Sequence, residues 1–249
     1  MTKVFFFIIF VLLASCSKRE TPVEIGNREK ILHLGNLSEP KDLDPHVVTG
    51  VSAYNIISAL LEGLVSEDPN DPALRPVPGV AESWSVSKDQ TVYTFKLRAN
   101  AQWSSGDPVT AADFVFSYQR MLSPAMGSPY AYMLHLLKNG RAFNLGTIHN
   151  FNEVGVKAVN DKTLELTLEQ PTPSFLSQLN HWSWFPVHPP TILKHGGMDE
   201  MGTAWTQPEN YIGNGAFTLK AWRQNQSIAV KKNPLYWDAE TVQLNEIHF

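Results

Sequence analysis

The clearest alternation of apolar and polar positions lies in residues 91–98. Tyr93, Phe95 and Leu97 alternate there with Thr94 and Lys96. This period of two is expected where a strand places one face on a core. A polar turn at residues 87–90 precedes the run, so the pattern predicts a hairpin that ends in this strand.

A helical period follows after Gly-Asp-Pro at residues 106–108. Thr110 is a good N-cap, and Asp113 lies three residues later, which is the spacing of a capping box. The apolar positions at i, i+4, i+7 and i+8 are Phe114, Tyr118, Met121 and Leu122. Because a residue before proline disfavours the helical conformation, Ser123-Pro124 ends the pattern. The sequence predicts a helix over residues 110–122.

Other segments carry weaker patterns. Residues 31–35 predict a first strand with Ile31 and Leu34, and also Leu32, turned inward. Ser52 is a candidate cap for a helix. The apolar stripe of that helix is formed by Ala53, Ile57, Leu60, Leu61 and Leu64. Residues 155–159 and 163–168, with turn residues between them, predict a hairpin.

Towards the end of the chain the pattern again favours strands. These lie at residues 217–219, 227–231 and 244–249. Ile247 and Phe249 have the character of core residues, so the last strand is expected to belong to an element that is not finished at residue 249. The polar residues 139–152 predict an exposed connection.

Composition and charge narrow the class of protein. The chain has 249 residues, of which 43% are hydrophobic, and its formal net charge is −4. This length fits one large domain or two small ones with a substantial core. The negative balance argues against a nucleic-acid-binding surface.

The N-terminus has the features of an export signal. Lys3 is followed by ten apolar residues, too few to span a bilayer but typical of the core of a secretory signal. The run ends in Leu-Ala-Ser-Cys, which resembles the lipobox of bacterial lipoproteins. This predicts a signal peptide at residues 1–15, a lipidated Cys16, and a flexible, polar tether over residues 16–30. The alternative is a plain secretory peptide with an incidental cysteine, which is the only one in the chain.

Known catalytic motifs are missing from the sequence. It has no Gly-x-Ser-x-Gly, no His-Glu-x-x-His and no phosphate-binding loop. His181 and His188 lie among aromatic residues, but neither has the close spacing of a metal-binding pair. Packed or surface histidines are the better interpretation. We expect neither an enzyme nor a metal or cofactor site.

Three motifs in order indicate a family. They are Ala-Glu-Ser-Trp at residues 81–84, Tyr-Thr-Phe-x-Leu-Arg at 93–98, and Trp-Ser-x-Gly-x-Pro-Val-Thr-Ala-x-Asp-Phe at 103–114. Together they resemble the signature region of the family 5 solute-binding proteins of ABC importers, and within it most resemble the oligopeptide-binding proteins. Leu-Asp-Pro at 43–45 and Asn-Pro-x-Tyr-Trp at 233–237 are similar to further family motifs.

The resemblance implies an α/β fold of the periplasmic-binding-protein type, class II, in its larger three-domain form. It implies a first part of domain I at residues 31–64, domain II at 65–185, and a return to domain I at 186–249. Members of the family are about twice as long. The third domain and the C-terminal part of domain I are therefore expected to have no counterpart in these residues.

The resemblance also implies a function without catalysis. A periplasmic or surface lipoprotein would capture oligopeptides and deliver them to ABC permease subunits in the inner membrane, with lobe closure as the signal. Alternatives within the family are receptors for dipeptides, murein peptides, nickel or haem. A truncated fragment that binds no ligand is the alternative from another class.

The resemblance carries a set of site residues. These are Thr49, Gly50 and Val51 from domain I, Tyr130 from domain II, and His181 and Trp184 near the hinge. Gly50 would permit close backbone approach. Thr49 stands where oligopeptide-binding proteins can carry an acidic residue, so any charge preference stays open. Tyr130 is interpreted equally well as an ordinary core aromatic.

Overall fold

The computed structural model of the protein describes residues 20–249. The predicted signal peptide and the lipidation site at Cys16 lie outside these residues. Within the described part, no helix has both the length and the apolar character that crossing a membrane requires.

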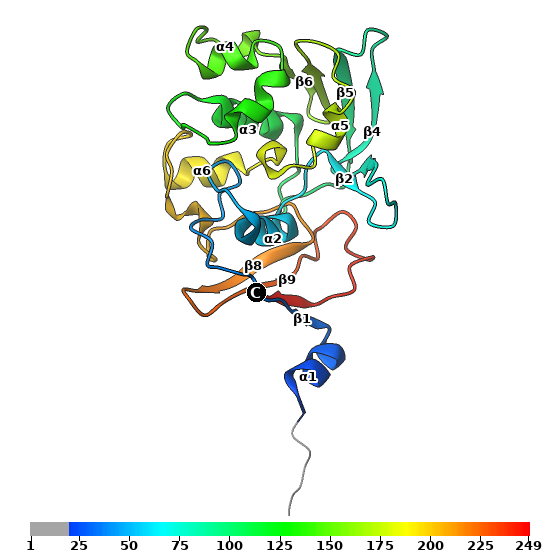
Figure 1. The fold of residues 1–249 in the computed structure, drawn as a ribbon, viewed down its shortest axis with the longest axis vertical. Helices are drawn as coiled ribbons and strands as arrows, with labels where there is room; N and C mark the ends of the chain where they lie inside the picture. The colour runs from blue at the N-terminus through cyan, green and yellow to red at the C-terminus, as the bar shows by residue number, and fades with distance from the viewer. Residues whose placement is uncertain (1–19) are drawn as a thin grey trace, which may run out of the picture.

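The strands of residues 20–249 form three sheets. One contains β1 (Ile31–His33), β10 (Glu246–His248), β9 (Ser227–Lys232) and β8 (Phe217–Arg223), in that spatial order. Another contains β4 (Ala81–Val86), β5 (Val92–Leu97), β7 (Thr163–Thr167) and β6 (Val156–Asn160). The third pairs β2 (Val65–Glu67) with β3 (Pro76–Pro78). The two four-stranded sheets lie at opposite ends of the main body of the molecule (Figure 1).

Helices lie between and around these sheets. The α-helices of the described part are α1 (Pro22–Glu29), α2 (Val51–Leu60), α3 (Ala111–Leu122), α4 (Gly140–Asn144), α5 (Phe175–Gln178) and α6 (Pro189–His195). Short 3₁₀ helices are η1 (Ala131–Leu136), η2 (Phe151–Glu153), η3 (Trp182–Trp184) and η4 (Ala204–Thr206). Figure 1 shows α1 projecting away from the main body beside β1.

The region with the strongest sequence pattern folds as predicted. Tyr93, Phe95 and Leu97 are buried on one face of β5, and β4 and β5 pair as an antiparallel hairpin. Thr110 and Asp113 form the capping box at the start of α3. The predicted hairpin of β6 and β7 is present as well.

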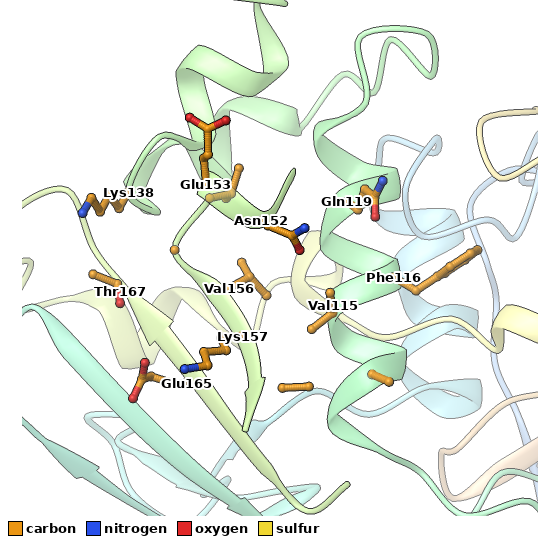
Figure 2. A pocket seen from close by; sticks show the side chains of 14 residues that line it. Val115, Phe116, Gln119, Lys138, Asn152, Glu153, Val156, Lys157, Glu165 and Thr167 are labelled. Carbon is orange, nitrogen blue, oxygen red and sulfur yellow. The ribbon is translucent and has the colours of Figure 1, made fainter. Parts of the chain in front are cut away.

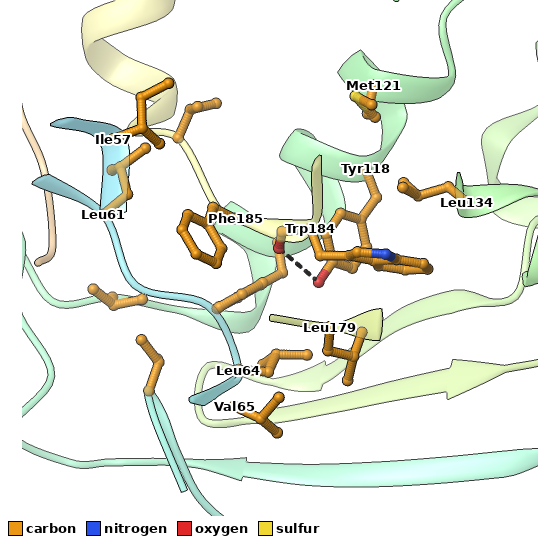
Figure 3. Close-up of a cluster of buried hydrophobic side chains, with 14 of the residues drawn as sticks. Ile57, Leu61, Leu64, Val65, Tyr118, Met121, Leu134, Leu179, Trp184 and Phe185 are labelled. Atoms are coloured by element: carbon orange, nitrogen blue, oxygen red, sulfur yellow. Dashed lines mark hydrogen bonds between the residues drawn. The ribbon is translucent and has the colours of Figure 1, made fainter. Parts of the chain in front are cut away.

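One hydrophobic core runs through the described part of the chain. Figure 3 shows a section in which Tyr118 of α3 and Trp184 of η3 lie beside residues of the segment that links α2 to β2. The Tyr118 hydroxyl donates a hydrogen bond to the Trp184 carbonyl oxygen at 3.2 Å. The core thereby joins α3 to the chain around α2.

The β1–β10–β9–β8 sheet brings the two ends of the described chain together. β1 and β10 run parallel, with Leu32 opposite Ile247. β8 and β9 pair as antiparallel strands, and α2 lies against β8 (Figure 1). The chain leading into β8 passes so close to α2 that a Cβ atom on Gly213 would lie 2.1 Å from the Leu60 carbonyl oxygen. Glycine is required there by the close approach of two backbones.

Two predictions about the first strand and the first helix of the core are wrong. Leu32 and Leu34 are 38% and 43% exposed, because β1 has only three residues and lies at the edge of its sheet. The helix α2 begins at Val51, with Gly50 rather than Ser52 as its N-cap. Ser52 instead forms a hydrogen bond with Ser38 through their side-chain oxygens, 2.8 Å apart.

Two segments predicted to lack structure contain helices. Residues 22–29 of the predicted tether form α1, because Thr21 and Glu24 make a capping box and a proline occupies the first turn. In the predicted exposed connection, Phe143 and Phe151 are buried with their ring centroids 5.1 Å apart. Burial of these two aromatic residues packs the polar segment against the core.

A buried ion pair joins α3 to the segment before α2. Arg120 and Asp44 are both fully buried, with Nη2 to Oδ2 at 2.6 Å and Nη1 to Oδ1 at 3.0 Å. Arg120 Nε also donates to the Met198 carbonyl oxygen at 2.8 Å. The two charges are therefore neutralised by a bidentate contact in the interior.

His46 completes this buried group. Its Nδ1 lies 3.0 Å from Arg120 Nη1, and its Nε2 lies 3.1 Å from the Phe185 carbonyl oxygen. Because a guanidinium only donates, Nδ1 must accept and Nε2 must carry the proton. Burial, together with the nearby Arg120 charge, lowers the pKa of His46 to about 4. His46 is therefore neutral at pH 7.

Candidate functional site

Four aromatic rings meet at the surface between α2 and the segment before η1. We call Tyr54, Tyr130, His181 and Trp182 the aromatic platform. Trp182 contacts the other three: its ring centroid lies 3.8 Å from that of His181, 5.3 Å from that of Tyr130 and 5.2 Å from that of Tyr54. The rings of Tyr130 and His181 are 4.9 Å apart, edge to face.

The platform is built from three separate segments. Tyr54 lies in the first turn of α2, and Tyr130 immediately precedes η1. His181 is the N-cap of η3, where its Nδ1 accepts hydrogen bonds from the Ser183 backbone N–H at 3.2 Å and from the Ser183 hydroxyl at 2.8 Å. These bonds fix the imidazole against Trp182, the first residue of η3.

The predicted loop at residues 49–51 adjoins the platform. Trp182 Nε1 donates a long hydrogen bond, 3.4 Å, to the carbonyl oxygen of Val48. Thr49 and Gly50 are exposed, and Val51 is 59% exposed. Gly50 has a φ of 100°, which favours glycine, and the backbone turns into α2 at this point. The structure thus brings Tyr130 and His181 together and places the loop next to them.

Trp184 does not belong to this group. Its side chain is fully buried, with ring centroids 5.4 Å from Tyr118 and 5.7 Å from Phe175. A 3₁₀ helix turns by a third of a circle per residue, so two residues separated by two positions face different sides. The ring of Trp182 therefore points towards the other platform residues, and the ring of Trp184 points into the core. A ligand at the surface does not reach Trp184 in this structure.

Sequence reasoning missed Trp182 and Tyr54. Tyr54 lies in the helix predicted after Ser52, and Trp182 lies among the aromatic residues around His181. Neither belongs to a recognised motif. The available signal was the aromatic-rich segment at residues 181–185, which does not reveal which of its rings point outward. Only the direction of η3 decides this.

The platform is electrically neutral at pH 7. Burial lowers the pKa of His181, so its imidazole is uncharged. Burial and the nearby Glu67 carboxylate raise the pKa of Tyr54. None of the ion pairs found in residues 20–249 includes a platform residue. The site therefore offers ring surfaces and backbone groups rather than charges.

A cavity of about 440 Å³ adjoins the platform. Tyr54 lines it together with Glu62, which accepts hydrogen bonds from the Tyr236 hydroxyl at 2.5 Å and from Trp237 Nε1 at 2.6 Å. Burial raises the pKa of the Glu62 carboxyl to about 7. Glu62 ties the end of α2 to the Asn-Pro-x-Tyr-Trp motif, which gives it a structural role.

Another cavity, of about 700 Å³, lies between α3 and β6. Val115 of α3 and Val156 of β6 stand on either side of it (Figure 2). None of its lining residues belongs to the platform. His188 is also separate from the platform, since it contacts Thr191, Asp107 and Trp103. In residues 20–249 no three His, Cys, Asp or Glu side chains are grouped to hold a metal ion.

These features define a class of protein. A mixed α/β fold with two separate four-stranded sheets and a neutral, aromatic, partly exposed site between their connecting segments fits a protein that binds a solute. The profile of the family described as "Bacterial extracellular solute-binding proteins, family 5 Middle" matches residues 75–249. The chain belongs to this family of solute-binding proteins.

Individual relatives agree with this assignment. The chain is 42% identical over 235 residues to the periplasmic oligopeptide-binding protein OppA of Escherichia coli, covering 92% of this chain and 41% of the relative. It is 36% identical over 220 residues to the dipeptide-binding protein DppE of Bacillus subtilis, covering 88% and 38%. The chain therefore spans about two fifths of the length of these relatives.

A solved structure shows the same fold. The crystal structure of Haemophilus influenzae OppA in complex with RPPGFSPFR superposes with a TM-score of 0.82 at 37% identity, covering 89% of this chain and 42% of that one. The expected α/β fold of the periplasmic-binding-protein type is confirmed.

Proposed function

We propose that the chain takes part in capturing oligopeptides outside the cytoplasm for uptake by an ABC importer. The observation that carries this proposal is the aromatic platform beside the exposed loop at residues 49–51. A receptor for many sequences must hold the peptide backbone through main-chain groups while aromatic surfaces accept varied side chains. The relatives named for oligopeptide and dipeptide binding support a peptide ligand.

The proposed partners are the peptide and the permease subunits of the importer. The role is binding rather than catalysis, as in the named relatives. The division into domain I (31–64 and 186–249) and domain II (65–185) remains part of the proposal. It is supported by the sheets, because β1, β8, β9 and β10 fall in the first set of residues and β4 to β7 fall in the second.

Native mass spectrometry of the purified chain tests peptide capture. We expect peptide adducts that are lost on denaturation, and a raised melting temperature when mixed peptides are added, because a ligand that binds only the folded state stabilises it. Tyr130→Ala should weaken both effects. Phe116→Ala, which alters the cavity between α3 and β6, is the control and should leave them unchanged.

The same experiment separates the alternatives. The mass of a bound ligand distinguishes an oligopeptide from a dipeptide, a murein peptide, nickel or haem. A protein mass without any adduct, combined with an unchanged melting temperature, would contradict peptide capture and favour a chain that binds no ligand by itself.

We further propose that Cys16 is lipidated after removal of residues 1–15, so that the protein is anchored to a membrane. The support is the lipobox-like ending of the apolar run and the periplasmic location that the name of the Escherichia coli relative OppA gives. Cys16→Ser is expected to move the protein from the detergent phase to the aqueous phase, since the acyl chains supply the membrane affinity. Ser15→Ala, which keeps the cysteine, is the control. Continued partitioning of Cys16→Ser into detergent would refute lipidation.

A further inference from the structure

We propose that the aromatic platform selects peptides that carry an aromatic side chain, and that Trp182 is the residue that determines this specificity. The inference rests on the proposed function, because it assumes that a peptide is the ligand. It concerns which peptides bind better, and it assigns that choice to one side chain.

Trp182 is held in place from two directions. On one side its indole contacts Tyr54, and its Nε1 donates to the Val48 carbonyl oxygen. On the other side the ring stacks on His181 with an angle of 24° between the planes and meets Tyr130 nearly at a right angle, 88°. Its orientation is therefore fixed before a ligand arrives, which reduces the entropy lost on binding.

The indole N–H of Trp182 and one ring nitrogen of His181 are already engaged. Trp182 Nε1 is bound to Val48, and His181 Nδ1 is bound to Ser183. What remains on Trp182 for a ligand is aromatic surface. A further aromatic ring gains from edge-to-face or offset stacking on such a surface, beyond what the burial of an aliphatic side chain provides.

Acidic side chains find no positive charge at the platform. His181 is neutral at pH 7, because burial lowers its pKa. The charge that acts on Tyr54 is the carboxylate of Glu67, which repels a second negative charge. A peptide aspartate or glutamate would lose hydration without gaining an ion pair.

The platform is open to a ligand rather than closed within the core. Tyr54, Tyr130 and Trp182 are each only partly buried. Beside them, Val51 is 59% exposed and Tyr132 is 57% exposed. Tyr132 also lies 6.1 Å from Tyr130, ring centroid to ring centroid, so it extends the aromatic surface outward.

Calorimetric titration of the full chain with tripeptides tests the inference. Three peptides carry one phenylalanine at the first, second or third position among alanines, and the references are trialanine and the three matching aspartate peptides. We expect at least one phenylalanine peptide to bind about three- to tenfold more tightly than trialanine. The aspartate peptides should bind less tightly than trialanine.

Variants assign the effect to Trp182. Trp182→Leu keeps apolar bulk and should bring the ratio of the phenylalanine and trialanine affinities close to one, while trialanine affinity changes little. Trp182→Phe should retain the preference. Trp222→Leu, on β8 outside the platform, is the control and should bind like the wild type.

A spectroscopic measurement covers the case in which Trp182→Leu does not fold. In wild-type protein labelled with 5-fluorotryptophan, the Trp182 resonance is identified from its loss in Trp182→Phe. It should shift on addition of the phenylalanine peptide that binds most tightly, and trialanine should shift it much less.

The outcomes distinguish the two proposals. Binding of all peptides with equal affinity, a preference that survives in Trp182→Leu, or a Trp182 resonance that does not respond would overturn this inference and leave peptide capture standing. If the wild type binds none of the tripeptides and none of the mixed peptides, the proposed function fails, and the inference fails with it.

Discussion

Replacing Arg120 with methionine is expected to lower the free energy of unfolding by about 3–5 kcal/mol. The substitution keeps a long side chain but leaves the Asp44 carboxylate buried without its bidentate partner. It also removes the donor to His46 and to the Met198 carbonyl oxygen. A buried charge that loses its partner costs far more than the pair itself contributes.

Urea unfolding followed by far-ultraviolet circular dichroism measures this loss. Arg28→Met is the matched control, since it makes the same substitution in an ion pair that is about half exposed, and it should leave the unfolding midpoint almost unchanged. An Arg120→Met variant as stable as Arg28→Met would contradict the expectation that Asp44 is buried and depends on Arg120 for its neutralisation.

Trp184→Ala is expected to lower the free energy of unfolding by about 3–5 kcal/mol, because it removes a fully buried ring and leaves a cavity. The ring packs against Tyr118 and Phe175 in the core that joins η3 to α3. Trp184→Phe should lose less, since it keeps a ring and removes an indole N–H that is buried without a hydrogen-bond partner.

Unfolding measured by circular dichroism again gives the result, with Tyr132→Ala as the control at an exposed aromatic position. Peptide titration of the same variants adds a second readout. If Trp184→Ala kept its stability and lost peptide binding, Trp184 would be a ligand residue rather than a core residue, contrary to its position in the structure.

The wrong predictions about local structure share a cause. Ser52 has the chemistry of a cap, but the backbone at Gly50, with its positive φ, starts the helix two residues earlier. Leu32 and Leu34 look like inward residues, but a three-residue edge strand does not cover them. In each case the residue type was interpreted correctly, but the surrounding structure decided the outcome.

The candidate site was only partly predictable for the same reason. Tyr130 and His181 came from a resemblance, and the structure brings their rings to 4.9 Å. Trp182 and Tyr54 complete the platform although they are far apart in sequence. A contact between residues 54, 130 and 182 leaves no periodic trace, since periodicity reports only which face of one element is covered.

The sequence by itself determined the family, the strand β5, the capped helix α3 and the hairpin of β6 and β7. The family follows from the resemblance of three motifs to known proteins. The elements follow from alternation, capping and turn residues, which act within a few positions of one another. The tertiary structure alone decided that Arg120 meets Asp44, and that Trp182 joins the aromatic platform while Trp184 is buried in the core. These depend on packing between segments 50 to 130 residues apart, roughly, where burial outweighs local preference.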